Sequence, residues 1–199
     1  MRIFDCFMFY DEEVVLDIRL NTLKNSVDCF VIVESKFYHN GKKRELKFNI
    51  DNFPKFKDKI IYIVQDEEPL DLETVKKDDD EGTKSYKFIF NAHKRENFQR
   101  NLISKGLVKS NEDDLIMISD VDEIPNLKDL NVAKVNNKIV IFEQDIFYYK
   151  LNRYLEGFTW HGTKACKKKN LKSPQWIRNV KNKKFGFWRI DTFFSETKY

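Results

Sequence analysis

The chain has 199 residues, of which 41% are hydrophobic and 15% are aromatic. This length suits one domain spanning residues 1–199, and the composition excludes a disordered chain, while 6 Gly and 4 Pro exclude collagen-like repeats. The net charge of +4 is a small difference between 36 basic and 32 acidic residues, so it favours an anionic ligand without indicating a specific nucleic-acid partner.

The first part of the chain predicts three strands and one helix. Residues 3–9 form an apolar run typical of a strand, although Asp5 interrupts it. A helix is expected to begin at residues 11–13, where acidic side chains favour a helix N-terminus. Its buried face is marked by apolar residues at helical spacing: Leu16, Leu20, Leu23 and Val27. Residues 29–33 and 60–64 are continuously apolar, as in strands covered on both faces.

The second part continues the alternation. Residues 65–85 are polar and predict a surface loop, whereas 86–107 predict a helix with Gly106 as its glycine C-cap. Residues 115–118 and 139–142 are further apolar runs that predict strands. Strands alternating with helices indicate an α/β fold with a Rossmann-type, mainly parallel sheet flanked by helices. Ligands of such sheets bind at the carboxyl ends of the strands.

Three cysteines and the apolar runs bear on where the protein works. Cys6, Cys29 and Cys166 have no CxxC spacing, and the first two lie in strand-like runs where thiols act as small hydrophobes. We therefore expect free thiols and a reducing compartment. No run approaches the ~18 apolar residues of a membrane span, and Asp5 interrupts any signal peptide. The sequence predicts a cytoplasmic protein without a transmembrane segment.

An acidic cluster follows the predicted strand at 115–118. Asp120 and Asp122 are two residues apart, so on an extended chain their carboxylates point the same way, and Glu123 adds a third. Their mutual repulsion would be removed by a divalent cation, and hard oxygen ligands favour Mg²⁺ or Mn²⁺. Pro125 then ends the strand. The alternative interpretation is an acidic turn that caps the next element.

Two basic regions have more than one interpretation. On the predicted helix, Glu96 and Arg100 stand four residues apart, beside Arg95. They form either a surface ion pair or a group that directs arginines at phosphates or orients metal ligands. The late basic residues indicate either a solvated face or an anion-binding surface. They are Lys167, Lys168, Lys169, Lys172, Arg178, Lys181, Lys183 and Lys184.

Short segments along most of the chain carry a family resemblance. In order, they are residues 4–7, 10–12, 18–20, 27–34, 41–42, 95–96, 99–101, 106–107, 118–125, 160–163 and 173–176. Together they resemble the family 17 glycosyltransferases. The resemblance implies a GT-A-like fold, a UDP-sugar donor, a glycan acceptor and inversion at the anomeric carbon. GlcNAc is one candidate for the transferred sugar.

The resemblance also assigns roles to individual residues. Asp120 and Asp122 would bind Mn²⁺ or Mg²⁺. The donor pocket would be lined or braced by Glu34, Arg95, Glu96 and Arg100. Trp160 and His161 become candidates for contacting sugar or metal, although a Trp is also a common core residue.

An inverting transfer needs a general base within hydrogen-bond reach of the acceptor hydroxyl. Glu123, Asp145 and Asp191 are candidates, and the sequence does not choose among them. Family members continue into a segment with a Gly-Trp-His motif, whereas residues 186–188 read Gly-Phe-Trp. We therefore expect a chain that lacks this C-terminal segment. Because the vertebrate members carry a membrane anchor whereas this sequence starts directly at its first strand, we also expect a bacterial or viral enzyme.

Other functions remain open at this point. A non-catalytic nucleotide-sugar-binding module would share the donor residues but not the reaction. A different metal-dependent nucleotidyltransferase would favour a glycine-rich phosphate loop after the first strand, and residues 9–12 contain no glycine. Nucleic-acid binding rests only on the late lysines.

Overall fold

The computed structural model describes residues 1–128, 130–131, 135, 137–149 and 152–181. None of the helices in these ranges is both long and apolar enough to cross a membrane. In chain order, the elements are β1 (Ile3–Phe9), α1 (Glu13–Leu23), β2 (Cys29–Ser35), η1 (Ile50–Asn52), η2 (Pro54–Lys59), β3 (Ile60–Gln65), α2 (Glu81–Asn101), α3 (Ile103–Gly106), β4 (Leu115–Ser119), β5 (Val140–Ile141), β6 (Gln144–Phe147), β7 (Tyr154–Trp160), β8 (Lys164–Lys167), η4 (Lys168–Asn170) and α4 (Pro174–Asn179).

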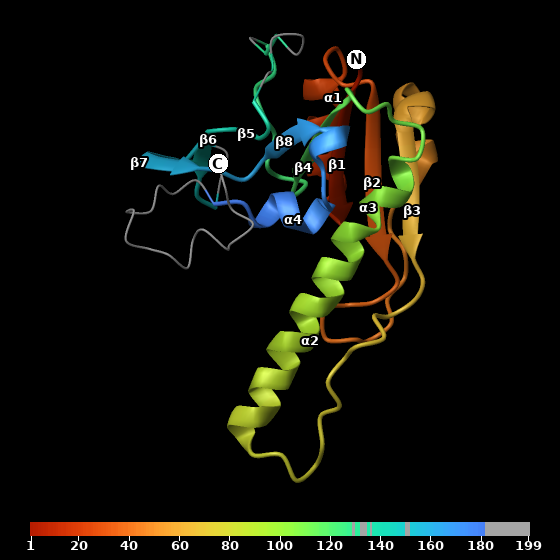
Figure 1. The fold of residues 1–199 in the computed structure, drawn as a ribbon, viewed down its shortest axis with the longest axis vertical. Coiled ribbons are helices and arrows are strands. Elements are labelled where there is room, and N and C mark those ends of the chain that lie inside the picture. The colour runs from red at the N-terminus through yellow and green to blue at the C-terminus, as the bar shows by residue number, and fades with distance from the viewer. Residues whose placement is uncertain (129, 132–134, 136, 150–151, 182–199) are drawn as a thin grey trace.

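A six-stranded sheet forms the centre of the molecule, in the order β3-β2-β1-β4-β8-β5. The strands β3, β2, β1 and β4 are parallel, whereas β8 runs antiparallel to both of its neighbours. The strands β6 and β7 form a separate antiparallel pair that extends to one side of the sheet (Figure 1). The predicted α/β class with a mainly parallel sheet is confirmed.

Side chains of β1 alternate between two hydrophobic cores, as expected for a strand covered on both faces. Ile3 and Phe7 pack with α1 and η2 on one face. Phe4 and Cys6 pack with α3 and α4 on the other. The long helix α2 begins far from the sheet and reaches it only at its C-terminal end (Figure 1). The sheet is therefore a central layer with a hydrophobic core on each face. The carboxyl ends of its strands remain accessible at a cavity.

The predicted strands agree with β1, β2, β3 and β4, and the differences lie at the two edges. β3 is an edge strand and is only half-buried over most of its length. The strand expected at 139–142 is reduced to Val140–Ile141, at the opposite edge. The strands β6, β7 and β8 were not predicted, because their sequences lack long apolar runs.

The helix expected at 86–107 begins earlier and ends differently. Asp80 caps α2 by accepting a hydrogen bond from the backbone N–H of Thr83 at 2.9 Å, so the helix starts at Glu81. The prediction that Gly106 is a glycine C-cap is wrong, since Gly106 is the last residue of α3, Leu107 is the C-cap, and positive φ among the described glycines occurs only at Gly41 and Gly157. A Cβ on Gly106 would lie 2.5 Å from Cγ1 of Val31. This glycine therefore lets α3 pack closely on the sheet.

All three cysteines are free, as expected from their spacing. Cys6 and Cys166 are buried, while Cys29 is half-buried at the start of β2. Burial raises the pKa of the Cys166 thiol to about 12, so this thiol is protonated and acts as a core side chain.

Candidate functional site

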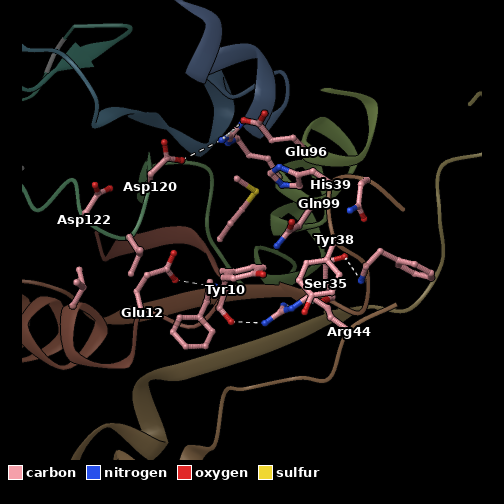
Figure 2. Close-up of a pocket in the computed structure, with 17 residues that line it drawn as sticks. Tyr10, Glu12, Ser35, Tyr38, His39, Arg44, Glu96, Gln99, Asp120 and Asp122 are labelled. Carbon is pink, nitrogen blue, oxygen red and sulfur yellow. Dashed lines mark hydrogen bonds and ion pairs between the residues drawn. The ribbon is translucent and has the colours of Figure 1, made fainter. Parts of the chain in front are cut away.

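The carboxyl ends of β1, β2 and β4 border a cavity of about 870 Å³ (Figure 2). Segments following these strands and one face of α2 supply its polar and aromatic lining: Tyr10, Glu12, Ser35, Tyr38, His39, Asn40, Arg44, Glu96, Gln99, Arg100, Asp120 and Asp122. We call this space the strand-end cavity. Its position is the one that ligands occupy in parallel α/β sheets.

A buried ion pair lies beneath the acidic loop that follows β4. Arg19 of α1 and Asp5 of β1 are both fully buried, and their side chains form two hydrogen bonds of 2.8 and 2.6 Å. The guanidinium also lies over the ring of Phe7, 4.6 Å from its centroid. Asp5 therefore does not interrupt β1, because its charge is paired within the core.

The remaining donors of Arg19 fix the backbone of the acidic loop. Its Nη1 donates to the carbonyl oxygens of Asp120, Val121 and Glu123 at 3.0 to 3.1 Å. Its Nη2 also donates to Oγ of Ser119 at 2.5 Å. One side chain thus sets the shape of residues 119–123. Arg19 was not predicted as a site residue, although a charged residue on the apolar face of α1 was a visible signal.

Two arginines bind the carboxylate of Asp120. Nη2 of Arg100 donates to Oδ1 at 3.1 Å, and Nη2 of Arg178 donates to Oδ2 at 2.6 Å. Arg178 comes from α4, which begins where Ser173 caps the helix. From the sequence, Arg178 was only one of the late basic residues, because its distance from Asp120 along the chain gave no sign that the two side chains meet.

Glu123 is a fixed part of the site. It is buried, and its Oε1 accepts from Nη2 of Arg178 at 2.7 Å and from Nε1 of Trp160 at 2.6 Å. Its Oε2 accepts from the backbone N–H of Asp120 at 2.8 Å. A Cβ on Gly162 would lie 2.2 Å from the Glu123 carboxyl, so only glycine allows this approach. Both carboxylate oxygens of Glu123 are engaged.

Asp122 differs from both neighbouring acids. Its side chain is exposed at the cavity and forms no ion pair with another described residue. Partial desolvation raises its pKa, and the nearby charges of Glu123, Asp120 and Glu12 add to this effect. The loop therefore presents one free carboxylate in an environment that favours a cation.

The described residues contain no group of three or more His, Cys, Asp and Glu side chains arranged to hold a metal ion. Mg²⁺ commonly binds through one or two carboxylates, with substrate phosphates completing its coordination. Asp122 fits that requirement as a free oxygen ligand. Each oxygen of Asp120 accepts a hydrogen bond from an arginine, so Asp120 would be a second ligand only through its remaining lone pairs.

Glu34 lies beneath the strand-end cavity and is not among the residues that line it. It is fully buried and accepts hydrogen bonds from the backbone N–H groups of Lys47 and Phe48. It also pairs with Arg44 at 3.1 Å. The guanidinium of Arg44 lies 4.2 Å from the ring centroid of Tyr10, so Glu34 positions an arginine of the cavity wall.

The predicted pair Arg95 and Glu96 separates into two environments. Arg95 donates to Oε1 of Glu68 at 2.5 Å and to the carbonyl of His39 at 3.1 Å, so it supports a loop that forms part of the cavity wall. Glu96 lines the cavity and accepts from Nη2 of Arg100 at 2.9 Å. The i,i+4 pair therefore belongs to the network around Asp120.

Two further cavities meet the first at Asp120. One, of about 500 Å³, is lined by Glu96, Arg100, Asp120, Trp160, His161, Lys164 and Arg178, among others. The other, of about 640 Å³, is lined by Asp120, Asp122, Glu123, Gln144, Asp145, Ile146, Phe147, Tyr149 and Trp160. We call the latter the hairpin cavity, because β6 and β7 supply most of its wall. The acidic loop stands between these spaces.

The remaining predicted residues lie on the hairpin side. Asp145 on β6 is exposed and lines the hairpin cavity. His161 Nε2 lies 3.5 Å from Oε1 of Glu143. Lys164 lines the cavity of about 500 Å³. Burial lowers the pKa of its ammonium group to about 8, and the positive charge of Arg178 adds to this effect. Asp191 lies outside the described residues.

Comparison with known proteins agrees with the motifs along the chain. The profile of the family described as glycosyltransferase family 17 matches residues 1–179. A rat β-1,4-mannosyl-glycoprotein 4-β-N-acetylglucosaminyltransferase is 26% identical over 163 residues, which cover 80% of this chain and 27% of the rat protein. The chain thus spans about a quarter of the length of that relative, and no solved structure matches it. On the family profile, the chain belongs to glycosyltransferase family 17.

Proposed function

We propose that the chain is an inverting glycosyltransferase that moves a sugar from a UDP-sugar to a glycan hydroxyl. The proposal rests mainly on the meeting of three cavities at Asp120, in a chain of this family. The free carboxylate of Asp122 faces both the strand-end cavity and the hairpin cavity. A donor and an acceptor in these two spaces would meet at the acidic loop.

The strand-end cavity suits the nucleotide part of the donor. Tyr10 and Tyr38 have ring centroids 5.9 Å apart on its wall, and Arg44 lies over Tyr10. Aromatic faces and polar groups of this kind are typical of small-molecule pockets of this size. A six-stranded sheet in which only β8 runs against the other strands, with an acidic loop after β4, supports a GT-A-like arrangement. GlcNAc is proposed as the sugar because the rat relative is named for its transfer.

The acidic loop and its two arginines would hold the diphosphate. Asp122 and Asp120 would bind Mn²⁺ or Mg²⁺, which supplies charge stabilisation to the leaving diphosphate. Arg100 and Arg178 already neutralise Asp120, and each guanidinium has further donors for phosphate oxygens. We propose that these arginines orient the diphosphate across the loop.

Asp145 is the general base that we propose among the three candidates. Its exposed carboxylate lines the hairpin cavity together with Asp122, whereas both oxygens of Glu123 are engaged. The acceptor oxygen would form a bond to the anomeric carbon while Asp145 takes its proton. The bond from that carbon to the diphosphate oxygen would break, and its electron pair would leave on UDP.

Calorimetric titration of UDP and UDP-GlcNAc, with and without Mn²⁺, tests the donor site. Wild type should bind UDP more tightly with Mn²⁺, and Asp122→Asn should lose that increment because the amide removes an anionic ligand. Asp122 is exposed and has no ion-pair partner within the described part of the chain, so the substitution should leave the fold unchanged.

Asp58→Asn is the matched control, since Asp58 is an exposed acid in η2. It should bind UDP as wild type does. Equal Mn²⁺ dependence in Asp122→Asn and wild type would contradict the proposed metal ligand. Absence of UDP binding by folded wild type would contradict the donor site itself.

A further inference from the structure

A buried lysine lines the cavity of about 500 Å³ beside α4, which we call the lysine cavity. Lys164 is the first residue of β8 and pairs with Ile118 of β4 on one side and Ile141 of β5 on the other, so its backbone lies inside the sheet. The residue is only 8% exposed. Lysines are almost never buried this deeply unless their charge is paired.

The ammonium group of Lys164 has no carboxylate partner in the described part of the chain. Its Nζ donates one hydrogen bond to the backbone carbonyl of Arg178, near the C-terminal end of α4. Such a carbonyl carries only a partial negative charge, and a buried cation is costly without an anion. Two of the three N–H donors of Lys164 are thus left for another partner.

The carboxylates that line the lysine cavity are already engaged by its arginines. Both oxygens of Asp120 accept from Arg100 and Arg178, and Oε1 of Glu96 accepts from Arg100. Arg100 is also buried, and its Nε has no hydrogen-bond partner among the residues that the structure describes. The network around the lysine cavity is therefore short of hydrogen-bond acceptors.

We propose that the lysine cavity binds a phosphate group, separate from the diphosphate of the donor, with Lys164 as its charged ligand. A phosphate supplies both the negative charge and the acceptor oxygens that the cavity lacks. Asn179 offers further donors, because its Oδ1 accepts from Nε2 of Gln175 at 2.8 Å and its amide N–H groups remain. The volume of the cavity also accommodates the molecule that carries the phosphate.

This site goes beyond the proposed function, since Lys164 lines neither the strand-end cavity nor the hairpin cavity. Asp120 and Trp160 line both the lysine cavity and the hairpin cavity. A phosphorylated acceptor in the hairpin cavity would therefore reach Lys164 past these two residues. Free phosphate would present the same chemistry, so the two sources are separated by experiment.

The test is calorimetric titration of inorganic phosphate, glucose 6-phosphate and glucose into the full chain, without UDP or Mn²⁺. Wild type should bind at least one of the phosphate compounds and not glucose. Lys164→Met should weaken that binding about tenfold or more, because a charged hydrogen bond is lost while the apolar stem is kept. The matched control is Lys167→Met on the same strand, since Lys167 pairs with Asp113 and does not line the lysine cavity. It should bind as wild type does.

Urea denaturation of the same variants separates binding from stability. Lys164→Met should keep or raise the midpoint of unfolding, because no carboxylate partner is left unpaired. Asn179→Asp is a second variant at an exposed position, and its added negative charge should also weaken phosphate binding. A lower midpoint in Lys164→Met with unchanged phosphate affinity would make Lys164 a cap of α4 and would overturn the inference.

Saturating UDP with Mn²⁺ distinguishes the lysine cavity from the donor site. Phosphate should still bind under these conditions. Strict competition with UDP would assign Lys164 to the donor diphosphate and overturn the inference, while phosphate binding without any UDP binding would contradict the proposed function alone. Tighter binding of glucose 6-phosphate than of inorganic phosphate would support an acceptor as the source, and the reverse would support the free ion. No phosphate binding by folded wild type would overturn the inference.

Discussion

Two arginine–aspartate pairs meet the same loop and differ in their surroundings. The pair of Arg19 and Asp5 has side chains that are 0% exposed, and the donors of Arg19 point at fixed acceptors of the protein. The pair of Arg178 and Asp120 has side chains that are 15% and 38% exposed, at the meeting of three cavities. The first pair holds the backbone of the loop, while the second holds its side chains where a ligand can reach them.

The difference between the two pairs shows that a fully buried ion pair stabilises the fold, whereas a partly exposed pair leaves charged groups within reach of a ligand. A buried ion pair must have all its hydrogen bonds satisfied, because desolvation costs several kcal/mol per ion. Arg19 meets that condition through Asp5, Ser119 and three carbonyls. Arg178 divides its donors among Asp120, Glu123 and the carbonyl of Gly162 beside open space. In the proposed function, a phosphate would replace part of this pairing.

Loss of the buried pair should have the largest effect. Arg19→Met leaves Asp5 uncompensated in the core and releases the loop carbonyls. We expect the free energy of unfolding to fall by about 3–5 kcal/mol, measured by urea denaturation. Arg2→Met is the control, since Arg2 is partly exposed and pairs with Asp114 at the other end of the sheet. Equal losses in the two variants would show that burial does not distinguish the pairs.

Gly162→Ala disturbs the link between the loop and the hairpin. Its Cβ would meet the Glu123 carboxyl at 2.2 Å and Nε1 of Trp160 at 2.3 Å, so one of them must move. We expect a loss of about 1–3 kcal/mol in unfolding free energy and a changed tryptophan fluorescence spectrum. Gly82→Ala in the first turn of α2 is the control and should cost less. An unchanged stability in Gly162→Ala would contradict this packing.

Arg178→Gln tests the partly exposed pair of Arg178 and Asp120. Asp120 keeps Arg100 and Glu123 keeps Trp160, so stability should fall by only about 1 kcal/mol. UDP affinity with Mn²⁺ should fall about tenfold or more, since a charged donor to phosphate is lost. Calorimetry and urea denaturation on the same sample separate these effects. A large loss of stability with unchanged UDP affinity would assign Arg178 to the fold.

The sequence predicted the elements whose pattern is local. Continuous apolar runs predicted β1, β2, β3 and β4. Of the acidic residues after β4, Asp120 and Asp122 line the strand-end cavity, whereas Glu123 lines the hairpin cavity. The polar hairpin of β6 and β7 escaped prediction, because its strands pair with each other outside the main core. Gly106 was misassigned because its role is a contact with Val31, which only the packed structure reveals.

The partners of the site residues could not be predicted, because they come from distant parts of the chain. Arg19 and Asp120 are 101 residues apart, and Arg178 and Asp120 are 58 apart. Glu34 was expected at the donor pocket, and the structure shows it fully buried beneath Arg44. Residue type and spacing thus indicated which carboxylates to consider, while tertiary contacts decide which of them are free.

The most direct test of the central claim is donor turnover by the full chain. Wild type would be incubated with UDP-GlcNAc, Mn²⁺ and a pool of oligosaccharides, and followed by proton NMR of the anomeric signals. The account predicts UDP release with a new glycosidic signal of inverted configuration, which Asp145→Asn and Asp122→Asn lose. Binding of UDP-GlcNAc with neither transfer nor hydrolysis would contradict the account and would leave a nucleotide-sugar-binding module.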